Sequence, residues 1–590
     1  MKAIAKQSIE FAEAPEQAVK AADAILGANP FVGLDSDQVI EQLSLFVNET
    51  LKNPEVLGGQ LIKMAVELFK VVAGVSDVAP EESDKRFTDP TWSDNPFYRR
   101  VMQAYLVWRS TMMSMVPDNG SGDGEWKETE QQRFAVRLLT EALAPTNVLI
   151  GNPAALKRAF ETGGTSLVHG LRSFFDDLWN NNGMPQTVDK RPFAVGRNLA
   201  VTPGAVVFRS EILELLQYAP ATRQVYERPI MLVPPQINKF YVMDLAPKRS
   251  LTEYAVARGV PFFTVSWRNP RPEHRNWGLD EYVTALTDAV DAVCEISGSS
   301  TVNLLGVCSG GITSTLMLGH LAAAGDHRVN AASLIVTMLD SSMPSMTGMF
   351  TTREGVAAAI DRSRRQGVLN GAEMERLFAW LRPNDLVWNY WVNNYLMGKD
   401  PAPFDILYWN ADSTNLPARL HAGFMELLLH NGLTRAGTVQ ILGTPIDLRQ
   451  AGHDMFVVGG MTDHICAWRA VYNGARLFGG RTEFVLNSSG HVQTLVCPPT
   501  NFKAKYYVNS VLGADPETWV KGATEQKGSW WDHWLGWLDK RSGDKREAPA
   551  SLGSLRFPPL EPAPGKYVME QADGTSSLGR LLMKQIERTE

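Results

Sequence analysis

One short segment constrains the fold of this chain more than any other: Gly306-Val307-Cys308-Ser309-Gly310-Gly311. The apolar run at residues 302–307 predicts a buried strand, and residues 312–324 predict a helix. The glycines permit a sharp turn from strand to helix, where a Cβ atom would clash. Such a turn carries the Cys308 side chain to the end of a sheet, which points to an α/β fold. The alternative is a buried structural cysteine on an ordinary turn.

The second part of the chain alternates between predicted strands and helices. Apolar runs predict further strands at residues 205–208, 230–233, 262–265, 333–339, 454–460 and 483–486, and residues 445–448 are expected to resume the sheet after an interruption. An amphipathic pattern over residues 279–293 predicts the helix that leads to the strand before Cys308. This alternation favours a doubly wound, mostly parallel sheet.

Two candidate partners for the Cys308 thiol follow later in the chain. Asp463 comes after the predicted strand 454–460, and His491 comes after the predicted strand 483–486. Both therefore fall in loops at the carboxyl ends of strands, where the active sites of α/β proteins collect. A nucleophile, an acid and a histidine in this order match the nucleophile-elbow pattern, with sulfur in place of the usual oxygen.

This pattern predicts roles for three side chains and two backbone amides. We expect Cys308 to be the nucleophile, Asp463 the acid and His491 the base. The Ser309 backbone amide, at a helix N-terminus, is the expected oxyanion donor, together with an amide of residues 233–238. An alternative for Asp463 is a structural role in a turn or as a helix cap.

Composition indicates the cellular compartment and limits the kinds of partner that we expect. The net charge of the 590 residues is −7, which implies no general affinity for nucleic acid or an anionic membrane. Four cysteines do not make a disulfide framework, and no Cys/His spacing resembles a zinc site, so we expect no metal and a reducing cytoplasm. No apolar run approaches the ~18 residues of a transmembrane helix, and the N-terminus lacks the apolar core of a signal peptide.

The chain divides into a helical N-terminal domain, residues 1–190, and an α/β domain, residues 191–590. In the first part we expect helix breaks at residues 27–30 and 58–59, a linker at 81–95, a helix over 95–115 and further helices over 128–180. Between about 341 and 440 the α/β alternation lapses in an aromatic-rich insertion, which predicts a cap over the site. The tryptophans of residues 530–538 favour a helix packed on the core over an exposed apolar patch.

A set of motifs is similar to those of a known family. They are Arg86-Phe87 through Trp92, Asn95-Pro96, Ala144-Pro145-Thr146-Asn147, Pro234-Pro235-Gln236-Ile237-Asn238-Lys239, Ser266-Trp267-Arg268-Asn269-Pro270, the segment around Cys308, Asp463-His464 and Ser489-Gly490-His491. Together they span residues 86 to about 500. The chain resembles the polyhydroxyalkanoate (PHA) synthases, bacterial acyltransferases that polymerise (R)-3-hydroxyacyl-CoA.

The resemblance implies an α/β-hydrolase fold and an acyl chain carried as a thioester on Cys308. CoA would be the leaving group of the substrate, so no cofactor is expected. It also implies a cytoplasmic homodimer on the surface of polymer granules. Apolar side chains should serve the water-insoluble product and self-association, and the candidates are Met102, Tyr105, Trp108, Trp388, Tyr390 and Trp391.

Other residues leave choices open. His464 either supports the site or makes a structural hydrogen bond, and Arg268 either meets CoA phosphates or forms a structural ion pair. Gln493, with residues 388–395, favours monomers with medium-length side chains, whereas Thr337 leaves a short-chain preference open. Two other classes compete with the synthase: a cysteine-dependent hydrolase, either a thioesterase or a dienelactone-hydrolase relative, and a non-catalytic granule-surface protein.

Overall fold

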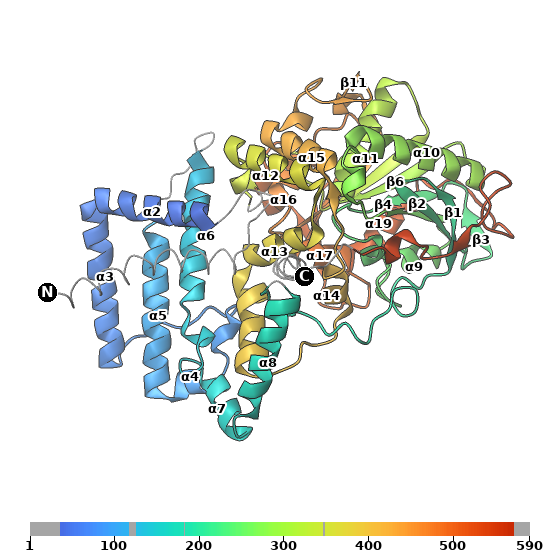
Figure 1. Ribbon diagram of the computed structural model, residues 1–590. Coiled ribbons are helices and arrows are strands. Elements are labelled where there is room, and N and C mark those ends of the chain that lie inside the picture. The colour runs from blue at the N-terminus through green and yellow to red at the C-terminus, as the bar shows by residue number, and fades with distance from the viewer. Residues whose placement is uncertain (1–35, 117–124, 182, 346–347, 572–590) are drawn as a thin grey trace, which may run out of the picture.

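The computed structural model describes residues 36–116, 125–181, 183–345 and 348–571 (Figure 1). The expected break at residues 27–30 therefore lies outside the described residues. Among those described, no helix combines the length and apolar character that crossing a bilayer requires.

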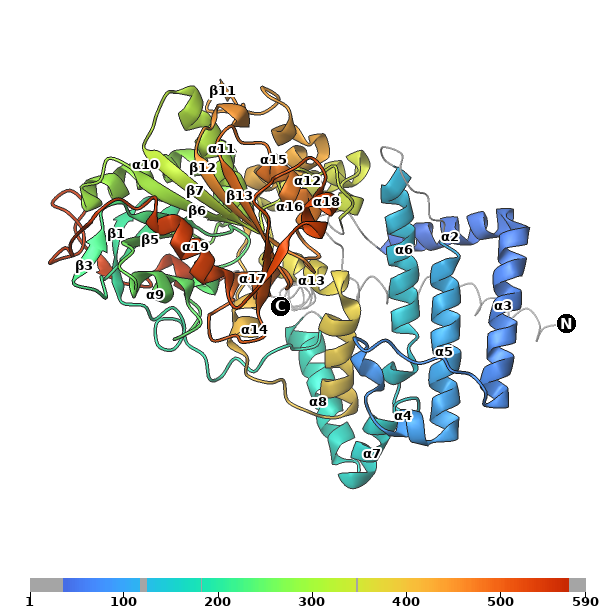
Figure 2. The same cartoon turned by 180° about the vertical axis from the view of Figure 1, so that it is seen from behind.

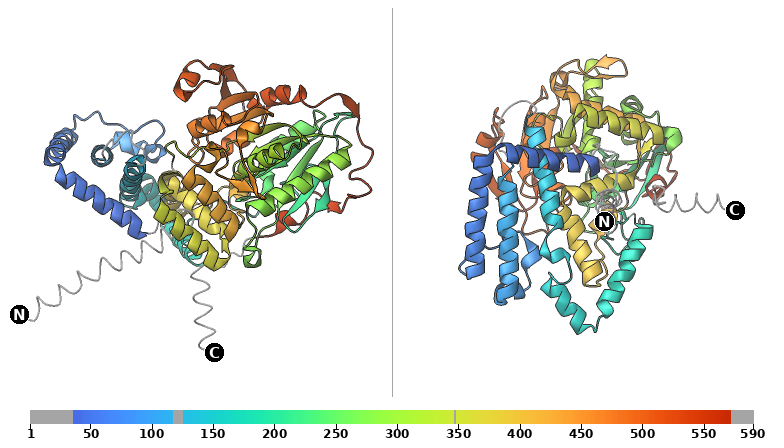
Figure 3. Two further views of the ribbon diagram at one scale, coloured as in Figure 1. Left: turned by 90° about the horizontal axis from the view of Figure 1, so that it is seen from above. Right: turned by 60° about the vertical axis from the view of Figure 1, so that its left-hand side comes forward.

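Helices dominate the chain before residue 181. They are α2 (Ser36–Lys52), α3 (Pro54–Ala73), α4 (Thr91–Asp94), α5 (Pro96–Ser114), α6 (Glu125–Ala142), α7 (Pro153–Glu161) and α8 (Thr165–Asn180). Figures 1 and 3 show α2, α3, α5 and α6 standing beside the α/β part as a separate layer. The predicted helices over 95–115 and 128–180 are confirmed.

The expected break at Gly58-Gly59 is wrong, because α3 continues through both glycines. Glycine weakens a helix by about 1 kcal/mol without ending it, and α3 ends instead at Gly74, which takes the left-handed conformation that favours glycine.

Residues 81–95 are more than a linker. They contain a 3-10 helix (Lys85–Phe87) and α4, and they bury Phe87 and Trp92 against Tyr105 of α5. Arg86 donates a hydrogen bond to the Tyr105 hydroxyl at 2.9 Å. Met102 and Tyr105 are thus buried in a local core, and the prediction that they offer apolar surface is wrong: their spacing on α5 serves packing within the N-terminal helices.

The α/β part is built on one sheet of eleven strands, in the order β15-β14-β13-β12-β7-β6-β4-β5-β2-β1-β17. The parallel centre consists of β13 (Thr482–Asn487), β12 (Asp454–Gly460), β7 (Val329–Ile335), β6 (Val302–Val307), β4 (Ile230–Val233) and β5 (Phe262–Trp267). Antiparallel strands extend both edges: β1 (Gly204–Arg209), β2 (Leu213–Tyr218), β14 (Lys505–Val508), β15 (Thr524–Lys527) and β17 (Glu561–Pro562). The predicted mostly parallel sheet is confirmed.

Two predicted strand positions need correction. Strand β7 ends at Ile335 and not at residue 339, since the backbone turns at Val336, which has a φ of 45°. Residues 445–448 do not rejoin the main sheet. Their only strand, β11 (Thr444–Pro445), pairs with β10 (Gln440–Ile441) in a separate hairpin, and the sheet resumes at β12.

Helices cover both faces of the sheet (Figure 2). One face packs against α10 (Leu279–Ser297), α11 (Ser309–Ala323) and α16 (Trp468–Ala475), and the other against α9 (Leu251–Val256) and α19 (Trp530–Asp539). The Trp534 indole of α19 is buried and donates a hydrogen bond to Ser333 Oγ of β7 at 3.0 Å. The tryptophan cluster therefore belongs to the core, as predicted.

The insertion between β7 and β12 is mainly helical, with α12 (Arg353–Gln366), α13 (Gly371–Leu381), α14 (Asp405–Asn410) and α15 (Ala418–His430). Two π-helices (Asn384–Trp388 and Trp391–Leu396) carry three of its aromatic side chains, Trp388, Trp391 and Tyr395. Trp391 and Tyr395 pack edge-on against Phe174 of α8, and the Trp391 indole donates to the Asn147 carbonyl at 3.0 Å. These rings join the insertion to the N-terminal helices, so the expectation that Trp391 offers apolar surface to the product needs correction. Trp388 packs edge-on against Trp380 and Trp391 within the insertion.

Candidate active site

Cys308 lies at the strained turn between β6 and α11. Its backbone has φ 51° and ψ −122°, a conformation that a non-glycine residue adopts only when its surroundings enforce it. The Cys308 amide donates to the Ile335 carbonyl of β7 at 3.0 Å. A Cβ atom at Gly310 would stand 2.3 Å from the Pro234 carbonyl oxygen, so only glycine lets α11 approach the loop after β4 this closely. The predicted strand-to-helix turn is confirmed.

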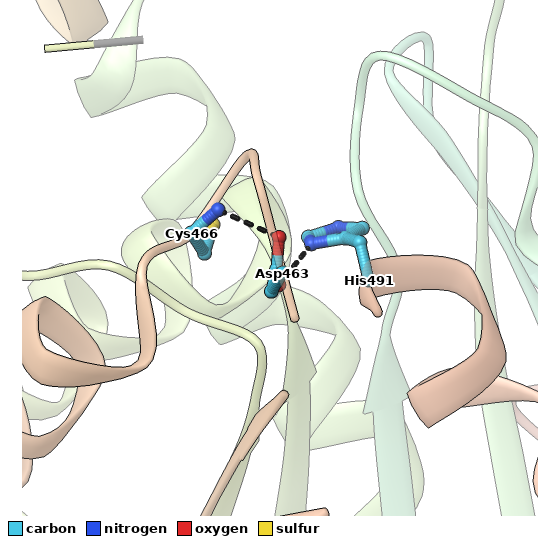
Figure 4. A group of neighbouring side chains, drawn as sticks. All are labelled: Asp463, Cys466 and His491. Carbon is cyan, nitrogen blue, oxygen red and sulfur yellow. Dashed lines mark hydrogen bonds and ion pairs between the residues drawn. The ribbon is translucent and has the colours of Figure 1, made fainter. Parts of the chain in front are cut away.

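Asp463 and His491 meet at the same edge of the sheet (Figure 4). Asp463 follows β12, and His491 begins the short helix α17 (His491–Leu495) after β13. His491 Nδ1 lies 2.7 Å from Asp463 Oδ2. The other oxygen, Oδ1, accepts the amides of Ile465 (2.8 Å) and Cys466 (2.9 Å). Because the carboxylate accepts from Nδ1, the ring presents Nε2 as its basic nitrogen.

The electrostatics favour an ionised Cys308. A hydrogen bond from the Cys466 thiol lowers the pKa of Cys308. Burial raises this pKa, whereas the charge of His491 and the Ser309 amide lower it further. Burial alone would lower the pKa of His491, but the neighbouring Asp463 and Cys308 raise it above its ordinary value. The pair is thus arranged as thiolate and imidazolium.

Sequence patterns did not single out Cys466. Its only local signal is its place three residues after Asp463. The hydrogen bond to Cys308, together with burial, raises the pKa of the Cys466 thiol well above its usual range, so this thiol remains protonated as a donor. Ligand atoms of Asp463, Cys466 and His491 lie within 4.8 Å of one another. Two of these three groups, Asp463 and His491, already form a hydrogen bond with each other.

Four further residues that the sequence singled out lie outside the group formed by Cys308, Asp463 and His491. Burial lowers the pKa of His464 to about 4, so its ring is neutral, and its Nδ1 has no hydrogen-bond partner within the described residues. Thr337 is buried behind the elbow, with its hydroxyl donating to the Ile335 carbonyl at 3.2 Å. Gln493 is exposed on α17. Arg268 forms an ion pair with Glu570 at 3.4 Å, the structural role considered for it.

The loop after β4, expected to supply an oxyanion donor, does reach the elbow. The Gln236 amide donates to Ser309 Oγ at 3.2 Å. Pro234 and Pro235 carry no N–H group, and Val233 belongs to β4. Ile237 therefore offers the first amide after β4 that neither the sheet nor Ser309 engages.

Comparison with known proteins gives a consistent assignment. Residues 83–255 match the family described as poly-beta-hydroxybutyrate polymerase (PhaC) N-terminus, and residues 242–496 match the alpha/beta hydrolase fold. The chain is 45% identical over 552 residues to poly(3-hydroxyalkanoate) polymerase 1 of Ectopseudomonas oleovorans, covering 94% of this chain and 98% of that protein. It is 38% identical over 497 residues to the polymerase subunit PhaC of Cupriavidus necator, covering 83% of each.

The sheet and its cysteine elbow place the protein among enzymes of the α/β-hydrolase fold. More specifically, the chain belongs to the poly(3-hydroxyalkanoate) polymerase family, whose members are acyltransferases. The predicted family and fold are confirmed, and this assignment disfavours both the hydrolase and the non-catalytic alternatives.

Proposed function

We propose that this protein polymerises (R)-3-hydroxyacyl groups from their CoA thioesters into polyhydroxyalkanoate and releases CoA, with Cys308, Asp463 and His491 as its catalytic residues. One observation carries the proposal: in a polymerase-family chain, a buried thiol at a strained elbow has its pKa lowered by an imidazole whose Nδ1 lies 2.7 Å from the Asp463 carboxylate.

The first step loads the acyl group. The Cys308 thiolate attacks the thioester carbonyl while His491 holds the proton, and the amides of Ser309 and Ile237 stabilise the oxyanion that forms. The carbon–sulfur bond to CoA then breaks, and His491 returns the proton to the departing thiolate. One thioester replaces another, so the acyl group stays activated.

The second step extends the chain. The 3-hydroxyl of an incoming monomer attacks the acyl carbon on Cys308 and gives its proton to His491; an ester bond forms and the bond to Cys308 breaks. Asp463 can act directly on the hydroxyl or orient His491. The geometry favours orientation, because one carboxylate oxygen is held by two amides and the other faces the imidazole.

Water must be kept from the acyl-enzyme, since hydrolysis would compete with elongation. Cys308, Asp463 and His491 are all buried. Thr414 of the insertion donates a hydrogen bond to the Gln236 carbonyl at 2.7 Å, in the loop that contacts Ser309 at the elbow. The insertion thus fits a cap that excludes water and shifts to admit substrate.

For the polymer surface and for self-association, the exposed apolar faces of two N-terminal helices replace the residues that sequence suggested. On α3 they are Ile62, Val66, Phe69 and Val72, and on α8 they are Val168, Leu171 and Phe175. Such faces fit a protein that works at an apolar granule in the cytoplasm as a homodimer. Both short-chain and medium-chain monomers remain candidates, since Thr337 is buried behind the elbow and Gln493 is exposed.

The decisive experiment incubates the purified protein with 3-hydroxybutyryl-CoA and with longer homologues, and follows both CoA release and product size. Polymer together with CoA supports the proposal. Release of CoA with only free hydroxy acid would identify a cysteine hydrolase, and absence of CoA release would point to a non-catalytic granule protein.

A further inference from the structure

Gln236 occupies a junction between the elbow and the cap, and the mechanism above does not use its side chain. It is almost wholly buried. Its side-chain Nε2 donates to Thr313 Oγ1 on α11 at 3.0 Å, while its backbone amide donates to Ser309 Oγ at 3.2 Å. Thr313 directs its own proton to the Gly310 carbonyl at 3.0 Å, so its oxygen is free to accept from Gln236.

These bonds fasten the loop after β4 to the first turn of α11 in two places. The first turn of α11 carries the Ser309 amide, and the loop carries the Ile237 amide, one residue beyond Gln236. An oxyanion needs both amides at fixed positions, because hydrogen bonds that must reorganise during the reaction lose most of their value. The bond from the Gln236 side chain thus helps to hold the loop that carries Ile237 against α11.

A third bond extends the junction to the cap. Thr414 Oγ1 donates to the Gln236 carbonyl at 2.7 Å, and Ser413 forms a β-bridge with Asn238. The next residue, Asn415, accepts the amide of Gly371 at the start of α13 at 3.0 Å. The cap insertion is therefore connected through residues 413–415 to the loop that carries Ile237.

Stability alone does not account for a glutamine here. Its Oε1 is buried and has no hydrogen-bond partner within the described residues. A buried acceptor without a partner destabilises a fold, and an apolar side chain of similar size would avoid this cost.

We infer that Gln236 is a positioning residue for acyl transfer: it fixes the Ile237 amide relative to the Ser309 amide, and Thr414 makes that spacing depend on the position of the cap. The inference rests on the proposed acyl-transfer function. Two reactions of the Cys308 thiol distinguish this positioning role of Gln236 from a general structural role. Acyl transfer from CoA needs an oxyanion site, whereas alkylation of Cys308 by iodoacetamide reports only on the thiolate.

The test compares Gln236→Met with the wild-type full-length protein in both reactions. Removing the bond to Thr313 should slow single-turnover CoA release from 3-hydroxyacyl-CoA by about tenfold or more, while the alkylation rate stays within about twofold. Gln440→Met is the matched control, because this glutamine is exposed on β10, and both of its rates should match wild type.

Thr414→Val tests the link to the cap. It also keeps the inference testable if Gln236→Met does not fold. It should slow CoA release without changing alkylation, and unchanged CoA release would overturn the inference. Equal loss of both reactions in Gln236→Met would overturn it as well, since Gln236 would then support the thiolate or the fold. A wild-type protein that released no CoA would overturn the proposed function too, whereas an active wild type with unaffected variants overturns this inference alone.

Discussion

At the scale of single residues, the site depends on a thiol whose reactivity is set by its neighbours. The Cys466 thiol, His491 and the Ser309 amide all lower the pKa of Cys308 and so favour its charged form. Cys466 and His491 come from different segments of the chain, so a substitution can remove each of these side chains separately.

Replacing the nucleophile should abolish the reaction. Cys308→Ala should release no CoA, because no neighbouring group is placed at the elbow, and Cys308→Ser should leave only traces, since a hydroxyl is a far weaker nucleophile near pH 7. Single-turnover CoA release measures both. Normal polymer synthesis by Cys308→Ala would refute the proposed mechanism.

The pH dependence of Cys308 alkylation should reveal the effect of Cys466. A lowered pKa keeps the thiolate present below the ordinary thiol value of about 8.5, and reactivity is lost only as pH falls through the lowered pKa. Cys466→Ala removes the largest stabilising contact, so its alkylation profile should move to higher pH. Cys466→Ser keeps a donor and should lie nearer to wild type. Coincident profiles for all three proteins would show that Cys466 does not tune the nucleophile.

His491 and Asp463 can be separated by half-reaction. His491→Ala should slow acylation of Cys308, measured as single-turnover CoA release. If Asp463 orients His491, as its 2.7 Å contact suggests, Asp463→Asn should impair acylation and elongation alike. Near-normal acylation with defective elongation would instead assign Asp463 to the incoming hydroxyl.

At the scale of elements, α19 shows how an aromatic run stabilises the sheet. Trp530, Trp531 and Trp534 are fully buried against the face opposite α11, and Trp534 also bonds to Ser333 of β7. The helix therefore contributes to the core on which the central strands rest.

Truncating this contact should destabilise the fold. Trp534→Ala leaves a cavity and an unpaired Ser333 hydroxyl, so the free energy of unfolding should fall by about 3–5 kcal/mol. Urea denaturation measures the loss. Phe502→Ala is the control, since Phe502 is 94% exposed and its replacement should change stability by about 0.5 kcal/mol or less. A similar small effect for Trp534→Ala would show that α19 is peripheral.

At the scale of the whole molecule, exposed apolar side chains follow one face of each of two N-terminal helices, α3 and α8. Phe69 on α3 is 73% exposed and Phe175 on α8 is 52% exposed. Single exposed apolar residues are ordinary, but runs along one face of a helix indicate a binding surface.

Polar replacements on these faces should weaken association without removing chemistry. We expect Ile62→Ser with Phe69→Ser, or Leu171→Ser with Phe175→Ser, to lower granule binding and dimer formation, as should deletion of residues 1–80. CoA release should survive at least in part, since all three proposed catalytic residues lie beyond residue 300. Sedimentation with and without substrate, and fractionation between cytosol and granules, measure the effects. Unchanged partition in both pairs would exclude these faces.

The sequence by itself determined the strand and helix around Cys308 and the order of the candidate site residues along the chain. Periodicity and glycines act locally, so they located β6, α11 and the turn at Cys308, and the positions after β12 and β13 indicated Asp463 and His491. The same local reasoning failed at Gly58-Gly59, because two glycines weaken α3 without ending it.

Only the tertiary structure decided which side chains join the site and which turn away. Cys466 contacts Cys308 from a segment more than 150 positions along the chain, and Gln236 meets Thr313 and Thr414 from two other segments. Gln493, two residues after His491, is exposed because the first turn of α17 directs it outward. Such contacts depend on the direction of each side chain in the folded protein, which spacing along one strand or helix does not specify.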